Sequence, residues 1–150
     1  MRLAIAKARQ GIRGGQTPFG ACIVKNRRVV ACAHNRVWKN IDATAHAEVT
    51  AIRQACRRLG TIDLSGCVLY STCEPCPMCF GAIHWAKIKK VIFGSAIKDA
   101  RRAGFSELNI PNRRMKQLGH SPVDVVGELL AEESRRLFAE WKAGGKGRVY

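Results

Sequence analysis

The first 41 residues contain no aspartate or glutamate, so every ionised side chain in this part of the chain is cationic. Over the whole chain, 26 Lys and Arg residues stand against 11 Asp and Glu residues, which gives a formal net charge of +15. Such a basic surface attracts polyanions such as nucleic acids. A basic surface that binds no polyanion has the same composition, so charge alone selects no function.

Two other absences narrow the class of protein. No stretch approaches 18 consecutive apolar residues, which excludes a membrane-spanning helix. Only five of the 150 residues are proline and 47% are hydrophobic, which excludes a disordered chain. The start of the chain leads into a helical pattern without an apolar signal core, so we expect a cytoplasmic protein. The length is typical of one domain, and residues 1–150 are expected to form it.

The seven cysteines are an odd number and indicate no disulfide framework. Four lie singly in apolar runs, where we expect free thiols that pack as small hydrophobic groups: Cys22, Cys32, Cys56 and Cys67. The other three are crowded into the segment CEPCPMC over 73–79. In a chain expected to be cytosolic, such crowding is more typical of a metal or redox site than of a disulfide.

Hydrophobic periodicity predicts a helix, then a hairpin, then alternating helices and strands. The predicted helices cover 3–12, 45–59, 77–87 and 129–141, and Thr44 and Gly60 are the expected caps of the second. The predicted strands cover 21–24, 29–33, 67–70, 91–93 and 123–126, with Gly94 ending the fourth. Residues 95–121 lack a clean period and are predicted to be an irregular connection with at most one short helical turn. This order predicts an α/β sandwich with helices on both faces of one sheet.

Two short motifs place metal-ligating side chains at predicted helix starts. His46-Ala47-Glu48 lies at the start of the second helix, and Cys76-Pro77-Met78-Cys79 lies at the start of the third. Cys76 and Cys79 are three residues apart in a first turn, so both sulfurs face one tetrahedral ion. His46 and Glu48 are about 200° apart on an ideal helix, so they converge only around its open end.

These residue types predict a catalytic zinc site. One neutral His and two thiolates balance the charge of Zn²⁺, and three protein ligands leave the fourth tetrahedral position for water. Two positive helix termini help keep the thiolates deprotonated. We therefore predict one Zn²⁺ per chain, held by His46, Cys76 and Cys79, with Glu48 as the catalytic proton shuttle.

Each motif alone has a simpler interpretation. An isolated CxxC is more often structural zinc or a redox pair, and Cys73 and Cys76 share that spacing with Cys76 and Cys79. Only the combination favours catalysis, with Cys73 packing behind the site. The remaining histidines have no partners in sequence and are expected in the surface or the core: His34, His84 and His120.

The segments Thr44–Glu48 and Cys73–Cys79 resemble the cytidine and nucleobase deaminase superfamily, whose pattern is H-x-E and P-C-x-x-C. The similarity extends from the first helix to Tyr150. It implies a three-layer α/β/α sandwich around a five-stranded mixed sheet, with the zinc ligands assigned above. It also implies that Glu48 takes a proton from the attacking water, protonates the ring nitrogen next to the reacting carbon, and then helps ammonia leave.

Further segments are most similar to bacterial guanine deaminases: Pro18–Ala21, Ser71–Cys79, Ile83–Ala86 and Phe138–Lys142. In those enzymes the C-terminal segment covers the active site of the partner subunit. The resemblance therefore implies a homodimer in which the tail over 143–150 is exchanged and serves as a lid.

The same resemblance implies contacts with the substrate. Asn35 and Tyr150 would contact the base, and Phe19 and Trp85 would form apolar walls. Glu107 would accept hydrogen bonds from adjacent N–H groups of guanine, which a carboxylate can meet bidentately. The simpler alternatives are that Phe19 and Trp85 are core residues, Asn35 is a turn residue and Glu107 is a solvated loop charge.

We accordingly expect deamination of a nucleobase or nucleoside, with guanine converted to xanthine and ammonia as the first choice. The second is deamination of the wobble adenosine of tRNA. Arg36, Trp38 and Ala43 depart from the guanine pattern, residues 127–133 resemble the tRNA enzymes, and the basic charge favours an RNA partner. The third is a nucleic-acid-binding module with structural zinc, which would need four protein ligands.

Overall fold

The structure of the protein, a computed structural model, describes residues 1–144 and 148–150. Its centre is a five-stranded sheet with the strand order β2-β1-β3-β4-β5. The strands are β1 (Gly20–Lys25), β2 (Arg28–His34), β3 (Cys67–Cys73), β4 (Lys90–Ser95) and β5 (Asp124–Val126). β1 is antiparallel to both β2 and β3, whereas β3, β4 and β5 are mutually parallel. The prediction of a five-stranded mixed sheet is confirmed.

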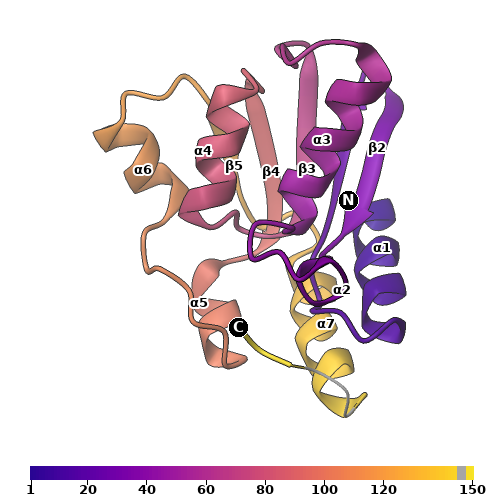
Figure 1. The fold of residues 1–150 in the computed structure, drawn as a ribbon. Helices are drawn as coiled ribbons and strands as arrows, with labels where there is room; N and C mark the ends of the chain where they lie inside the picture. The colour runs from indigo at the N-terminus through magenta and orange to yellow at the C-terminus, as the bar shows by residue number, and fades with distance from the viewer. Residues whose placement is uncertain (145–147) are drawn as a thin grey trace.

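Helices cover both faces of this sheet (Figure 1). α3 (Ala47–Leu59) and α4 (Pro77–Trp85) cover one face, and α1 (Arg2–Arg13) and α7 (Ala131–Ala143) cover the other. Alternate residues of the central strands, such as Leu69 in β3 and Val91 in β4, are fully buried between the layers. The three-layer α/β/α sandwich is therefore confirmed.

Two glycines allow the second pair of helices to approach the sheet closely. A Cβ at Gly20 would collide with the carbonyl oxygen of Ala4 in α1, and a Cβ at Gly94 would collide with the hydroxyl of Ser134 in α7. The prediction that Gly94 ends the fourth strand is wrong, because β4 continues to Ser95. The missing side chain makes room for a helix instead of breaking the strand.

The expectation that Cys22 and Cys32 are separate free thiols is wrong. They lie directly opposite each other in the β1–β2 hairpin, with their Cα atoms 4.0 Å apart, and form a disulfide. The two-residue turn at Asn26 and Arg27 alone would pair Cys22 with Ala31. A bulge near Val24 shifts the register by one residue and brings the cysteines together. Nothing in the local sequence signals that bulge.

Three short helices were not predicted as such: α2 (Val37–Asn40), α5 (Ile97–Arg102) and α6 (Asn112–Leu118). The prediction of an irregular 95–121 connection is wrong, since two helices flank a shorter loop. α3 begins after His46, so Thr44 is not its cap. The predicted tail over 143–150 falls partly on residues 145–147, which lie outside the described residues. Among the helices of the described residues, none combines the length and the apolar composition that a membrane span needs.

Candidate active site

Three metal-ligating side chains from two distant motifs meet at one end of the sheet. His46 Nδ1 lies 3.6 Å from Cys76 Sγ and 3.5 Å from Cys79 Sγ. The three donor atoms all lie within 4.8 Å of one another. We refer to His46, Cys76 and Cys79 as the donor cluster. The structure therefore brings together the three residues that the sequence predicts as ligands.

Helix starts position these side chains. His46 is the residue immediately before the first turn of α3, and Cys76 holds the same position at α4. Pro77 occupies the first turn of α4, where its fixed φ is favourable and its missing N–H costs no helical hydrogen bond. Both helix termini present partial positive charge to the donor cluster, which favours thiolate over thiol.

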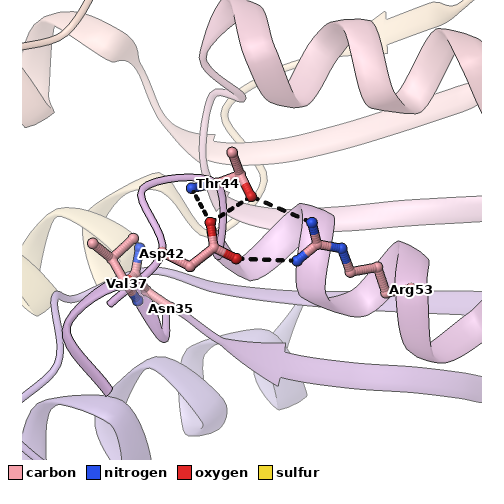
Figure 2. Close-up of polar contacts among 5 residues, drawn as sticks. All are labelled: Asn35, Val37, Asp42, Thr44 and Arg53. Carbon is pink, nitrogen blue, oxygen red and sulfur yellow. Dashed lines mark hydrogen bonds and ion pairs between the residues drawn. The ribbon is translucent and has the colours of Figure 1, made fainter. Parts of the chain in front are cut away.

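Side-chain hydrogen bonds shape the loop that delivers His46 (Figure 2). Asp42 Oδ1 accepts bonds from the backbone N–H of Thr44 at 2.8 Å and from its hydroxyl at 2.6 Å. The guanidinium of Arg53, which lies in α3, donates to the Asp42 carboxylate at 3.4 Å and to the Thr44 hydroxyl at 3.3 Å. At the other end of the loop, Asn35 Oδ1 accepts the backbone N–H of Val37 at 3.0 Å. The loop is thus tied both to itself and to the helix that it precedes.

The three side chains of the donor cluster shift one another's pKa values. A hydrogen bond from Cys79, assisted by the His46 ring, lowers the pKa of Cys76 to about 4 in spite of its burial. The bond to Cys76 and burial raise the pKa of the Cys79 thiol well above its usual value. Burial disfavours protonation of His46, but contact with Cys76 and the charge of Glu48 raise the pKa of His46 overall. A dication would replace these shared protons and relieve the crowding.

The donor cluster fits a zinc ion. One imidazole nitrogen and two sulfurs are ligands that zinc prefers, and tetrahedral bonds of normal length require N···S separations of about 3.5 Å. The separations of 3.6 Å and 3.5 Å match this requirement. Cys73 is buried but is not among the grouped donors, and its sulfur contacts the carbonyl of Ala96 at 3.6 Å. Within residues 1–144 and 148–150, the group has three protein donors, whereas structural zinc normally has four.

Glu48 lies beside the donor cluster in a buried position. Its Oε2 is 3.5 Å from Cys79 Sγ, and its Oε1 accepts a hydrogen bond from the Ser71 hydroxyl at 2.8 Å. Only 5% of Glu48 is exposed, and burial raises the pKa of its carboxyl group. A raised pKa suits a group that must take up a proton and return it near neutral pH.

A cavity of about 320 Å³ opens onto the donor cluster. Its lining includes His46, Cys76, Glu107 and Tyr150. A narrow recess continues inward to Phe19 and Glu48. This volume is at the lower end of the range for small-molecule sites. A larger cavity of about 570 Å³ is lined by residues such as Cys22 and Tyr70 and holds no donor cluster, so we assign it no role in the chemistry.

Tyr150, the last residue, lies over the donor cluster. Its ring centroid is 5.5 Å from that of His46, and its hydroxyl accepts a hydrogen bond from Asn35 Nδ2 at 2.7 Å. Trp38 holds the preceding part of the tail, because its indole N–H donates to the carbonyl of Arg148 at 3.0 Å. The guanidinium of Arg148 also lies over the Trp38 ring, 5.8 Å from its centroid. Asn35 therefore meets Tyr150 in this structure instead of the open cavity.

The structure brings the other predicted substrate residues together only in part. Glu107 lines both the cavity and the recess, and burial, with the nearby charge of Cys76, raises its pKa to about 7. Phe19 lines the recess and packs edge-on against Phe105 at 4.9 Å. Trp85 lies elsewhere. It is 81% exposed at the far end of α4 and lines a different cavity with Ile88, so its expected place in the wall of this site is not found.

Three residues with contacts at the site were not singled out as functional from the sequence. Ser71 holds Glu48, and Trp38 holds the tail. Glu74, inside the cysteine motif, accepts the backbone N–H of Ile97 at 3.3 Å and that of Asn112 at 2.8 Å, so it ties the starts of α5 and α6 on either side of the segment that carries Glu107. For Ser71, the available signal was a polar residue at a buried position of an alternating strand. Trp38 was noted only as a departure from the guanine pattern, and Glu74 gave no signal that sequence alone can interpret.

Comparisons with known proteins agree with this geometry. A family model described as the cytidine and deoxycytidylate deaminase zinc-binding region matches residues 1–95. The chain is 48% identical over 108 residues to guanine deaminase from Bacillus subtilis, covering 71% of this chain and 69% of that one. It is 41% identical over 143 residues to tRNA-specific adenosine deaminase from Aquifex aeolicus, covering 91% and 93%. The solved guanine deaminase of Nitrosomonas europaea has a TM-score of 0.84 and 30% identity, covering 93% and 81%.

Proposed function

Because the chain belongs to the cytidine and deoxycytidylate deaminase family and is a hydrolytic deaminase, we propose that its substrate is guanine, which it converts to xanthine and ammonia. The observation that carries this choice of base is the position of Tyr150. Its ring is 5.5 Å from that of His46 and lines the cavity, so the tail covers part of the cavity mouth, which suits a small free base. A tail that reduces access of water also strengthens polar contacts inside the cavity.

In this proposal His46, Cys76 and Cys79 hold one zinc ion per chain. When bound, zinc supplies a water molecule activated for attack on the ring carbon. Glu48 accepts a proton at its carboxylate, donates it to the neighbouring ring nitrogen, and assists departure of ammonia. Its burial beside the donor cluster supports this role.

Guanine would enter with its N–H edge toward Glu107. The adjacent ring N–H and exocyclic amine of guanine match the two oxygens of one carboxylate. Phe19 in the recess provides an apolar wall, and Asn35 holds the Tyr150 hydroxyl, which keeps the tail in place beside the base. Trp85 lines a different cavity, so we assign it no contact with the base in this chain's own site.

The second candidate is deamination of the wobble adenosine in tRNA. It is favoured by the net charge of +15 and by the similarity to the Aquifex enzyme over nearly the full length of both chains. An RNA loop would have to displace Tyr150 and Arg148 from the mouth of the cavity. Its binding would also fall steeply with salt, because phosphate contacts release counterions.

We also propose a homodimer. Large apolar side chains are exposed on α4 and α6, where Trp85 is 81% and Leu118 is 63% exposed, and a second copy would cover them. The family resemblance implies that the tail reaches the partner's site, whereas here Tyr150 contacts Asn35 of its own chain. Light scattering of the wild type and of Trp85→Glu tests this assembly; we expect a dimer and a weakened dimer, and a monomeric wild type contradicts it.

The substrate proposal is tested by ammonia release from guanine, guanosine, adenine, cytosine, cytidine and a tRNA with adenosine at the wobble position. Guanine is expected to give the highest kcat/KM, with little dependence on salt between 50 and 200 mM, about the range over which phosphate contacts are lost. If the protein deaminates the tRNA and not guanine, the first candidate is wrong and the second replaces it. Glu48→Gln protein with full zinc is the blank for every substrate.

A further inference from the structure

The hydroxyl of Ser71 occupies a position where the strand pattern calls for an apolar side chain. Residues 67, 69, 71 and 73 of β3 share the face covered by α3 and α4, and their other members are Cys67, Leu69 and Cys73. Ser71 is only 1% exposed. Burying a hydroxyl is costly unless it finds a hydrogen-bond partner. Its partner is the carboxylate of Glu48, so the buried serine is explained by the residue that it contacts.

We propose that Ser71 is a positioning residue for the deamination, which holds the Glu48 carboxylate so that Oε2 is the oxygen that moves the proton. The proposal rests on the deaminase activity of the family and not on the choice of guanine. It assigns different tasks to the two oxygens of one side chain.

The contacts of the two oxygens support this division. Oε1 accepts the Ser71 hydroxyl at 2.8 Å, on the side of the sheet. Oε2 lies 3.5 Å from Cys79 Sγ, on the side of the donor cluster. The terminal torsion of a glutamate has a broad energy profile, so the side chain alone does not hold one orientation. A hydrogen bond from the rigid strand does.

The strand register makes this contact specific to one residue. Ser71 lies opposite Ala21 of β1 and Phe93 of β4. The next hydroxyl along the strand, Thr72, belongs to the other face and accepts the backbone N–H of Gly20 at 3.0 Å. Only position 71 therefore offers a hydroxyl beneath the first turn of α3 within the described strand.

Two matched pairs of zinc-loaded full-length variants isolate the hydroxyl. Wild type and Ser71→Ala differ by the hydroxyl in a small side chain; Ser71→Thr and Ser71→Val differ by it in a larger one of nearly constant shape. In each pair, we expect loss of the hydroxyl to lower kcat about 10- to 100-fold, the usual range for residues that orient a catalytic group, with KM changed less than about twofold. The kcat of Ser71→Thr should exceed that of Ser71→Val by most of this factor, even if both variants are slower than wild type.

Ser95→Ala is the control for loss of a buried hydroxyl. Ser95 is fully buried and donates to the carbonyl of Thr72 at 3.0 Å, without contacting Glu48. Its kcat should stay within about twofold of wild type. Zinc content and melting temperature are measured for all variants, so that metal loss or unfolding is distinguished from a positioning effect.

A crystal structure of zinc-loaded Ser71→Ala gives a readout independent of activity. We expect the Glu48 carboxylate to rotate or to occupy more than one orientation. The proposal is overturned by a Glu48 carboxylate in its original single orientation, by a Ser71→Ala kcat within twofold of wild type, or by equal kcat values for folded Ser71→Thr and Ser71→Val. If the base proves to be adenosine in tRNA, the same comparisons are made with that substrate.

Discussion

The donor cluster and the wall of the cavity above it are built in opposite ways. The donor cluster comes from two short motifs, each at the start of a long helix packed on the central sheet. The wall comes from Glu107 and Tyr150, which lie in a loop and at the chain end. The first is set by local geometry and the second by contacts between segments far apart in sequence.

This difference separates chemistry from selectivity. Side chains at helix starts on a packed sheet are held precisely, as a metal site with a defined geometry requires. Residues on loops and tails are exchanged or lengthened with little cost to the core. One arrangement of ligands can thus serve enzymes with different bases, which agrees with the similarity of this chain to both guanine and tRNA deaminases.

The largest effect is expected for Glu48→Gln, which tests the residue beside the donor cluster. The amide keeps the size of the side chain but cannot accept and return the proton, so kcat should fall by at least about 10³-fold, within the range known for acid–base groups. Zinc content, measured by elemental analysis, should remain at one ion per chain. Turnover within tenfold of wild type at full zinc would show that another group moves the proton.

Removal of residues 144–150 tests the wall of the cavity, to which Tyr150 belongs. For guanine, kcat/KM should fall about 100-fold, because the tail that covers part of the cavity mouth is lost while the donor cluster and its zinc remain. Tyr150→Phe is the milder companion: it keeps the ring over His46 but loses the bond with Asn35, and a decrease of about tenfold or less is expected, the cost of one neutral hydrogen bond. An unchanged kcat/KM after truncation favours the tRNA substrate.

A smaller, pH-dependent effect is expected at Glu107. Burial, with the charge of Cys76, raises the pKa of Glu107 to about 7, so the carboxylate form increases as the pH rises from 6 to 8. Only this form accepts two hydrogen bonds from guanine, so KM should decrease over that interval. In Glu107→Gln, KM should be higher and nearly constant with pH. A KM that rises with pH in the wild type contradicts the role of Glu107 as acceptor.

The smallest effect is expected for Arg53→Ala. Arg53 supports the loop before His46 from α3, but its ion pair with Asp42 is solvent-exposed and long. Exposed pairs contribute little, and the bonds between Asp42 and Thr44 stay in place (Figure 2). Both kcat and KM should change by less than about threefold. A loss of zinc in this variant would mean that the donor cluster depends on its surroundings more than its position at helix starts indicates.

The sequence was informative where structure is determined locally. The pattern around His46 and Cys76 predicted a helix start at each, and three-residue spacing predicted that Cys76 and Cys79 share one face. Prediction from the sequence failed where contacts between distant residues determine the structure. The bulge that pairs Cys22 with Cys32 depends on the whole hairpin, and α5 and α6 are too short to show a clear hydrophobic period.

The substrate residues show the same division. Phe19 and Glu107 reach the recess, but nothing local distinguishes them from a core aromatic and a loop charge. Trp85 is the opposite case, since its motif implied a wall and the length of α4 carries it to the far end of the helix. A motif gives the identity of a side chain, and only the path of the backbone gives its location.

Glu74 gives this division a physical basis. A carboxylate embedded between two cysteines of the metal motif grips the backbone where α5 begins and again where α6 begins. Fourteen positions lie between those two anchors, and the backbone amides that hold them are common to every residue but proline. Three of these positions, Ala100, Ala103 and Phe105, are packed in the core, so side chains can be exchanged mainly at the exposed positions around Glu107. A change of nucleobase preference made at those exposed positions would leave the metal-binding frame as it is.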